Sequence, residues 1–245
     1  FSQTRFVALP PKKTKLRRWL SPLPSEVQNL WSPEMARCVD TTIAQFCPEV
    51  LLVGDPSLTP YVASHRDRLR ILDDVCVSTL QLERLRPLLP RKMWALWFFR
   101  WLKARAYFRR IAPVYDLYVV NSREDRAALL AVSSAWKKVE VLPNGLDLAV
   151  YPSSLAAPQP NTMVFPGALN YRPNLDAARH FIDNVLPLIR AEVPDVRFLI
   201  TGQAPTDGSA PQGSGVVYTG YVPDVRPVIA SAWVCPVPLR AGAGG

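Results

Sequence analysis

The sequence predicts an α/β fold built from parallel strands and intervening helices. Residues 163–245 run in the order strand, glycine turn, helix, strand, glycine turn and short helix, and they end inside a glycine-rich loop. A similar alternation of short apolar strands and helical stretches occupies the first half. The chain has 245 residues, of which 49% are hydrophobic, so it can bury a large core and is not expected to be disordered.

The first half contains three short apolar strands that end in a glycine or a polar residue, at residues 50–54, 70–74 and 116–121. Helical stretches separate these strands. Ser32 and Pro33 form an N-cap and a first turn for a helix that reaches about residue 46. Ser122 caps a helix over residues 123–132, whose first turn carries two acidic residues.

The chain is expected to divide into two domains. After a short apolar strand, Asn144 and Gly145 form a turn, and residues 151–161 are rich in proline and small residues. We place the interdomain linker at residues 151–161, between a first domain of residues 1–150 and a second domain of residues 162–245.

The second domain opens with a strand at residues 163–167, followed by a helix over residues 173–190 and a strand at residues 197–202. One face of the helix is apolar and carries Leu175, Ala178, Ile182, Val185, Leu186 and Ile189. The carboxyl edge of a parallel sheet of this kind commonly binds nucleotides and phosphates.

The formal net charge of +9 is concentrated in the first half of the chain. Thirteen of the 29 Lys and Arg residues fall within residues 1–20 and 91–110, and neither window contains an acid. This charge favours an anionic partner, such as nucleic acid, an anionic membrane surface or a phosphorylated ligand. No nucleic-acid-binding motif is recognised, so nucleic acid is not expected as a partner.

The cysteines and the hydropathy restrict the class of protein. The four cysteines lie far apart and there are only two histidines, so a structural zinc site is not expected. The cysteines are expected to be reduced thiols. No apolar run is long enough to cross a bilayer, and the longest candidate, near residues 94–102, contains Arg100. We expect a cytoplasmic protein, free or peripheral at the cytosolic membrane face.

Residues 91–110 have the composition of an interfacial helix. Four aromatic residues, Trp94, Phe98, Trp101 and Phe108, share one predicted helical face that basic residues border. Two interpretations remain open. The helix packs on the first sheet with its Arg and Lys side chains at the surface, or its rim contacts an anionic membrane.

Four motifs occur in a fixed order in the second half. They are Pro-Asn-Gly-Leu-Asp at residues 143–147, a glycine turn and helix start at 165–174, Gly-Tyr-Val-Pro-Asp-Val at 220–225 and Pro-Leu-Arg-Ala-Gly at 238–242. Together they resemble family-4 glycosyltransferases of the GT-B fold. The resemblance covers about residues 110–245 well and the first hundred residues weakly.

The resemblance implies two Rossmann-like domains that face each other across a cleft, the second of them incomplete. It also implies a nucleotide-sugar donor on the second domain, a glycan or lipid-linked acceptor on the first, and glycosyl transfer that retains configuration without a metal or other cofactor. Because negative charge builds on the leaving diphosphate, cations and backbone N–H groups must meet it. The donor-binding candidates are Gly167, Asn170, Arg172, Tyr221, Val222, Arg240 and Gly242.

Each donor-binding candidate has a structural alternative. Gly167 either lets the backbone approach the donor phosphates near a helix N-terminus or only forms a tight turn. Arg172 and Arg240 either contact the diphosphate or are solvated surface residues. Tyr221 and Val222 either hold the nucleobase or end a buried strand.

Other polar residues are weaker candidates. Where the family often has a histidine, this chain has Asp73 and Asp74, and an acidic pair at a strand end is more often exposed or a helix cap than catalytic. His65 and His180 are expected on the surface, and Asn144 in a structural turn. The catalytic residue is therefore not assigned.

Two parts of the family pattern are missing from the sequence. These are the amino-terminal strand with its glycine-rich loop and a lysine and glutamate motif on the helix expected after Gly245. We therefore expect a fragment without transferase activity of its own.

The sequence favours a hexosyltransferase of cell-envelope polysaccharide or glycolipid synthesis. Two alternatives stay open, a nucleotide-sugar epimerase of the same fold and a catalytically inactive sugar-nucleotide-binding subunit. The donor sugar, the acceptor and the linkage depend on pocket details that motif spacing does not encode.

Overall fold

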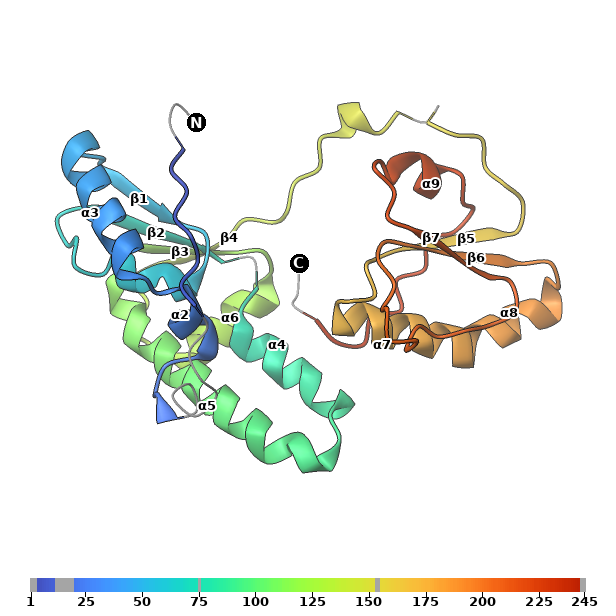
Figure 1. The fold of residues 1–245 in the computed structure, drawn as a ribbon, viewed down its shortest axis with the longest axis horizontal. Coiled ribbons are helices and arrows are strands. Elements are labelled where there is room, and N and C mark those ends of the chain that lie inside the picture. Colours follow the sequence, from blue (N-terminus) through green and yellow to red (C-terminus); the bar gives the residue numbers. More distant parts are fainter. Residues whose placement is uncertain (1–3, 12–19, 75, 153–154, 243–245) are drawn as a thin grey trace. The chain divides into compact units, whose positions relative to one another are not determined.

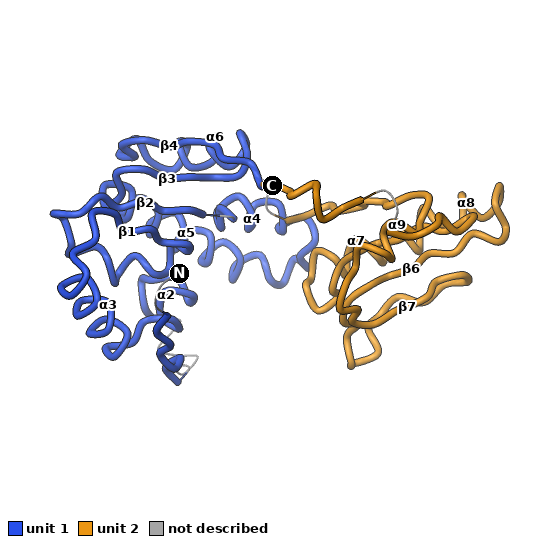
Figure 2. Tube along the Cα trace, turned by 90° about the horizontal axis from the view of Figure 1, so that it is seen from above, with its two compact units in different colours: residues 1–144, 243–245 blue, residues 145–242 orange. Residues whose placement is uncertain are grey.

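A computed structural model describes residues 4–11, 20–74, 76–152 and 155–242. The chain divides into two compact units at the bond between Asn144 and Gly145, shown in blue and orange in Figure 2. This boundary precedes the linker expected at residues 151–161. Each unit has its own parallel sheet and its own hydrophobic core (Figure 1).

The sheet of unit 1 has the order β1-β2-β3-β4, and all neighbouring strands are parallel. The strands are β1 (Val50–Val53), β2 (Leu69–Asp74), β3 (Leu117–Val120) and β4 (Val139–Val141). The three strands expected at residues 50–54, 70–74 and 116–121 are confirmed within a residue or two at each end. Their short apolar runs suit a sheet that is covered by helices on its faces.

The helices of unit 1 are α2 (Ser25–Leu30), α3 (Pro33–Phe46), α4 (Ser78–Leu85), α5 (Trp94–Ile111) and α6 (Arg123–Val132). Short 3-10 turns η1 (Pro56–Tyr61), η2 (Arg86–Leu88), η3 (Arg91–Met93) and η4 (Ala112–Val114) connect them. The caps expected for α3 and α6 are present. Ser32 Oγ accepts the N–H of Met35 at 3.4 Å, and Ser122 Oγ accepts the N–H of Asp125 at 3.1 Å.

The core of unit 1 joins the sheet to the helices around it. Ile43 of α3, Phe108 of α5 and Leu129 of α6 are all buried in one cluster with the strand residues. Tyr118 of β3 packs edge to face on Trp136, with ring centroids 4.9 Å apart. Side chains from distant parts of the sequence therefore close this core.

Unit 2 contains the sheet β5-β6-β7, again with parallel neighbours. Its elements are η5 (Leu148–Val150), β5 (Thr162–Pro166), α7 (Arg172–His180), the π-helical turn η6 (Phe181–Val185), α8 (Leu186–Glu192), β6 (Arg197–Thr201), β7 (Val216–Gly220) and α9 (Arg226–Ala230). Figure 1 shows α7 and α8 along one face of the sheet and α9 on the other.

The helix expected over residues 173–190 is present, but a π turn interrupts it. The physical reason is Pro187, which has no N–H to donate and whose ring crowds the carbonyl four residues earlier. The predicted apolar face is otherwise correct, because Ala178, Ile182 and Leu186 are buried in the second core.

Two sequence features lie partly outside the described residues. Five of the six basic residues in the window 1–20 fall within residues 12–19, and Val75 separates the described Asp74 and Cys76. Among the residues that the structure covers, no helix combines the length and the apolar content needed to cross a membrane.

Candidate functional site

The loops at the carboxyl edge of the unit 2 sheet are held side by side by backbone hydrogen bonds. The N–H of Gly167 donates to the carbonyl of Thr201 at 3.2 Å, and the N–H of Gly202 donates to the carbonyl of Gly220 at 2.8 Å. The loops that follow β5, β6 and β7 therefore form one continuous edge. Three of the four sequence motifs of the second half begin or end near it.

Glycine at position 202 allows two of these loops to touch. Gly202 has φ +98°, and a Cβ at this position would lie 2.9 Å from the backbone nitrogen and Cα of Ala168. A Cβ at Gly167 would lie 2.9 Å from Asn174 Nδ2. The loop after β5 is thus closely packed by its own neighbours, as the tight-turn interpretation of Gly167 expects.

The loop after β5 leads directly into α7. The side chain of Asn174, in the first turn of the helix, donates from Nδ2 to the carbonyl of Ala168 at 3.1 Å. Tyr171 is the N-cap residue, and its side chain makes no capping hydrogen bond. Arg172 is the first helical residue and its side chain is exposed. The Arg172 cation therefore lies at the positive end of the helix dipole. An anion bound there would be stabilised by the guanidinium and by the helix N-terminus.

Arg240 lies beside α7 because it is bound by Asp176. The Arg240 Nε and Nη2 groups donate to the two carboxylate oxygens of Asp176 at 3.0 and 2.7 Å. This hydrogen-bonded pairing raises the pKa of the Arg240 guanidinium. Arg240 is therefore a surface cation, with a side chain that is 45% exposed, and Asp176 holds its guanidinium in place. Gly242, two residues further on, has φ +142°.

The remaining sequence candidates lie in the same loops with different exposure. Asn170 donates from Nδ2 to Gln203 Oε1 at 3.4 Å, which joins the loops after β5 and β6 through their side chains. Tyr221 is 77% exposed, so the interpretation that it ends a buried strand is wrong for its side chain. Val222 is partly buried.

Sequence reasoning missed three residues that shape this edge, Asn174, Asp176 and Gln203. Asp176 had a weak signal, because it lies four residues after Arg172 and thus on the same face of the predicted helix, whereas Asn174, two residues after Arg172, lies on a different face. Gln203 follows the glycine that ends β6, and its carbonyl accepts the N–H of Leu169 at 2.8 Å. The pairing of Asp176 with a residue 64 positions away had no sequence signal.

A buried polar cluster lies at the carboxyl edge of the unit 1 sheet. Asp74 has 4% of its surface exposed, and it accepts the hydroxyl of Tyr118 at 2.5 Å and the N–H of Cys76 at 3.1 Å. Burial raises the pKa of Asp74 to about 6 and the pKa of Cys76 to about 11. The expectation of an exposed carboxylate at this position is therefore wrong. Asp74 does not cap the next helix either, because the N-cap of α4 is Val77 and no side chain of the described residues makes a capping hydrogen bond there.

The histidines and the Asn144 turn make local contacts. His65 Nε2 lies 2.9 Å from Asp40 Oδ1, and the carbonyl of His180 accepts Asn184 Nδ2 at 3.1 Å. Asn121 donates to Asn144 Oδ1 at 3.2 Å, so Asn144 ties the end of unit 1 to β3. Across the described ranges, no group of three or more His, Cys, Asp or Glu residues is arranged to hold a metal ion.

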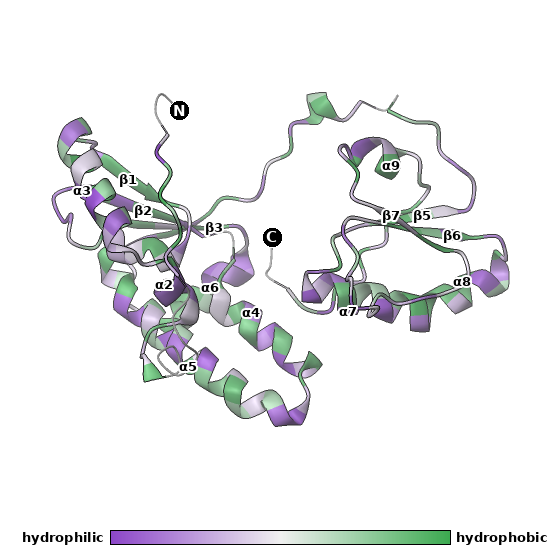
Figure 3. Cartoon of the chain, viewed as in Figure 1, coloured by the Kyte–Doolittle hydropathy of each residue, from purple (hydrophilic) through white to green (hydrophobic). Residues whose placement is uncertain are grey.

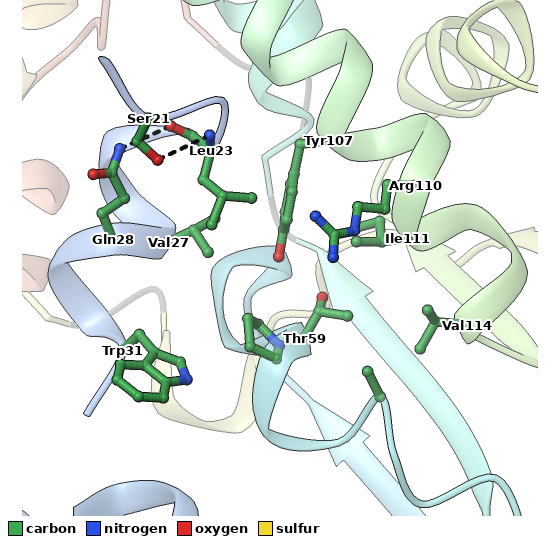
Figure 4. Close-up of a pocket in the computed structure, with 12 residues that line it drawn as sticks. Ser21, Leu23, Val27, Gln28, Trp31, Thr59, Tyr107, Arg110, Ile111 and Val114 are labelled. Atoms are coloured by element: carbon green, nitrogen blue, oxygen red, sulfur yellow. Dashed lines mark hydrogen bonds between the residues drawn. The ribbon is translucent and has the colours of Figure 1, made fainter. Parts of the chain in front are cut away.

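Unit 1 also contains a cavity of about 330 Å³ between α2, η1 and α5. Figure 4 shows Tyr107 and Arg110 of α5 on one side of it and Val27 and Trp31 on the other. The Tyr107 hydroxyl donates to the carbonyl of Pro56 at 2.8 Å, which fixes one wall. None of the seven donor-binding candidates lines this cavity, since all of them belong to unit 2.

Two comparisons with known proteins bear on the sequence pattern of unit 2 and on the fold of the chain. Residues 160–245 match a family model described as glycosyl transferases group 1. Among solved structures, the chain is similar to TarM, with a TM-score of 0.61 and 11% identity over 82% of this chain and 39% of that one. No curated protein matches the sequence.

Two further structures are similar. A sucrose-phosphate synthase from Thermosynechococcus elongatus has a TM-score of 0.61 and 15% identity over 89% of this chain and 57% of its own. Anabaena HepE, solved in complex with UDP-glucose, has a TM-score of 0.54 and 12% identity over 83% of this chain and 56% of its own. The chain thus spans from about two fifths to under three fifths of the length of these structures. The protein has the α/β fold of GT-B glycosyltransferases, and residues 160–245 carry the sequence pattern of glycosyl transferases group 1.

Proposed function

We propose that this protein is a glycosyltransferase that moves a hexosyl group from a nucleotide sugar to a glycan or lipid-linked acceptor. The observation that carries the proposal is the position of Arg240, which Asp176 holds beside the first turns of α7. Both residues lie within the range that matches the group 1 model. An anchored guanidinium and a helix N-terminus are the groups that a leaving nucleoside diphosphate requires.

The donor site proposed here is the carboxyl edge of the β5-β6-β7 sheet. The loop of Gly167 and Asn170 and the helix start at Arg172 would meet the diphosphate, together with Arg240 and Gly242. Tyr221 and Val222, in the loop after β7, would lie along the nucleobase. Asp176 would share Arg240 with the diphosphate, because one guanidinium offers five N–H donors and the Asp176 contact uses two.

Transfer with retention of configuration and without a metal ion is part of the same proposal. Positive side chains and backbone N–H groups can neutralise the leaving diphosphate without a bound cation. The acceptor would bind unit 1. The cytosolic face of a membrane is the proposed location for a lipid-linked acceptor.

The test is calorimetric titration of the purified protein with UDP-, GDP- and dTDP-sugars. Binding is the suitable readout because the chain spans only part of the solved transferases that it resembles. Arg240→Ala should weaken the binding of the preferred nucleotide sugar about tenfold, because it removes charged hydrogen bonds to the diphosphate. Arg172→Ala should weaken it by a smaller factor.

Arg197→Ala is the matched control, since Arg197 is exposed at the opposite, amino end of β6 in the same unit. It should leave the affinity unchanged. Absence of binding with all three classes of nucleotide sugar would contradict the proposal. An equal loss of affinity in the Arg197→Ala variant would contradict it too. Conversion of the sugar without any acceptor would instead indicate an epimerase. Binding without turnover in an acceptor assay of the complete protein would indicate an inactive subunit.

A further inference from the structure

Helix α5 contacts two different neighbours within unit 1. Its Ala104, Tyr107, Phe108 and Ile111 are buried in the core. A second side packs on α4, where Trp97 Nε1 donates to the carbonyl of Leu82 at 2.6 Å and Trp101 Nε1 donates to Glu83 Oε1 at 2.8 Å. The aromatic face expected from the sequence is therefore only partly correct. Phe98 and Trp101 stack with ring centroids 6.0 Å apart, but Phe108 belongs to the core.

A third side of α5 is exposed and apolar, and we name it the outer face. At about 100° per residue, it lies opposite the buried residues and carries Ala95, Phe98, Phe99, Leu102 and Ala106. Phe98 is 47% exposed, Phe99 51% and Leu102 41%. The Phe98 and Phe99 rings meet edge to face with centroids 6.5 Å apart, so the two rings form one surface.

Cations border the outer face on both sides. At the same helical spacing, Arg105 and Arg109 follow one side of it and Lys103 follows the other, whereas Arg110 lines the cavity beside Tyr107. Arg109 Nε donates to the carbonyl of Val132 at 3.0 Å, and the Arg105 guanidinium lies 4.8 Å from the Trp101 ring centroid. These two partners are neutral, so they leave the positive charges of Arg105 and Arg109 in place. Arg100 of the same helix differs, because its Nη2 lies 3.6 Å from Glu26 Oε1.

The same alternation can be followed along the whole hairpin. Figure 3 shows apolar and hydrophilic segments alternating along α4 and α5, and Figure 1 shows the hairpin extending away from the sheet. Trp94 and Leu96, near its far end, are 39% and 46% exposed. The exposed apolar surface is therefore largest in the first ten or so residues of α5 and gives way to the core at its carboxyl end.

We propose that the outer face of α5 docks on the surface of an anionic lipid bilayer. A narrow aromatic stripe with cations on both sides fits a bilayer surface, because the rings enter the boundary of the acyl chains while the cations stay at the headgroup phosphates. The complementary charge favours a lipid surface over a second copy of this chain, whose own outer face would bring the same cations together. The docking surface depends on α5 alone and not on the donor site, so either can fail without the other.

The experiment is co-sedimentation of the protein with vesicles of phosphatidylcholine, with or without about 30% phosphatidylglycerol. Binding is expected only with the anionic vesicles, and salt of about 0.5 M should weaken it because the Debye length shortens. The double variant Phe98→Ser with Phe99→Ser should lower the partition coefficient about tenfold or more, because two exposed rings no longer enter the bilayer. Phe46→Ser is the matched control, since Phe46 is 48% exposed at the end of α3, and it should bind as the unchanged protein does.

Charge reversal provides a second, independent arm. Arg105→Glu with Arg109→Glu should reduce vesicle binding about tenfold or more, whereas Arg37→Glu with Arg66→Glu makes the same change in net charge at other exposed positions of unit 1 and should have a much smaller effect. Circular dichroism melting of each variant verifies the fold. Failure to bind anionic vesicles overturns the proposal, and so does equal loss in both charge pairs. A dimer that the Phe98 and Phe99 variant dissociates, without vesicle binding, overturns it in favour of self-association.

Discussion

Asp74 is a carboxylate held inside unit 1 at a cost in free energy. Its partners are the Tyr118 hydroxyl and the Cys76 N–H, and burial dominates, since the pKa of Asp74 rises from its ordinary 3.8 to about 6. An acid with a raised pKa in the folded state stabilises the fold when protonated, below about pH 4. This contribution is lost as the pH rises through 6.

The raised pKa of Asp74 predicts how a neutral residue at this position would change stability. As the pH rises from 4 to 7, the free energy of unfolding of Asp74→Asn should increase relative to that of the unchanged protein by up to about 3 kcal/mol, because the amide needs no proton to remain neutral. Urea titrations at several pH values measure the difference. Asp116, whose pKa is lowered by its hydrogen bond from Lys137, gives the opposite trend in the protein as a whole, so the comparison must be between the two proteins. A constant difference across this range would contradict the assignment.

Gly202 gives a second prediction at the scale of one residue. Gly202→Ala should cost about 2–3 kcal/mol of stability, because the left-handed φ disfavours a side chain and the added Cβ meets the backbone of Ala168. Gly208→Ala separates the two causes, since Gly208 has φ +77° with open space around it and should cost about 1 kcal/mol. Thermal unfolding of both variants measures this. Equal costs would show that the collision with Ala168 does not matter.

At the scale of elements, α6 depends on its N-cap. Ser122 Oγ accepts the N–H of Asp125 at 3.1 Å and donates to Asp125 Oδ2 at 2.6 Å, and Asp125 is 1% exposed. The other oxygen of this carboxylate has no hydrogen-bond partner within the described part of the chain. The cap therefore satisfies the helix end and one of the two oxygens of the buried Asp125 side chain.

Ser122→Ala should destabilise unit 1 by about 1–2 kcal/mol, because it removes the cap and leaves the Asp125 carboxylate less satisfied. Ser133→Ala is the control, since its Oγ accepts the N–H of Ala135 just beyond the end of α6. That variant should cost less than about 0.5 kcal/mol. Urea unfolding followed by circular dichroism compares the two, and similar losses would argue against a special role for the cap.

The exposure of the aromatic residues of α5 depends on the elements that pack against the helix. The sequence predicted a helix with aromatic and basic residues, and the helix is confirmed at Trp94–Ile111. Which aromatic residues are exposed depends on where α4 and the sheet lie. Trp97 and Phe98 are adjacent in sequence, yet the first donates to the carbonyl of Leu82 and the second is 47% exposed.

At the scale of the whole molecule, each unit has a separate hydrophobic core, and residues 142–152 between them are all exposed. Leu146 and Leu148 are 61% and 76% exposed in this connection. Limited digestion with thermolysin should therefore cut first within residues 145–150, because an exposed backbone segment without a core opens at little cost. Mass spectrometry identifies the fragments. A first cut inside α5 or the β5-β6-β7 sheet would contradict two independently packed units.

The sequence by itself determined the local elements and their order. Ser32, Ser122 and the glycines after the strands act on backbone within a few residues of themselves, so their effect can be predicted from composition and spacing. The same local rules predicted the parallel α/β class and the apolar face of the helix that contains Ala178 and Ile182. The motifs at residues 143–147, 165–174 and 220–225 were detectable for the same reason, since each is a short run at or just after the end of a strand.

Only the tertiary structure decided the environment of the polar residues. Asp74 is buried because Tyr118, 44 residues away, covers it, and Arg240 is fixed because Asp176, 64 residues away, lies beside it. The outer face of α5 is exposed because α4 and the core pack on other sides of the helix. Burial and charge pairing arise from contacts between segments that are distant in sequence, and single-chain spacing carries no information about such contacts.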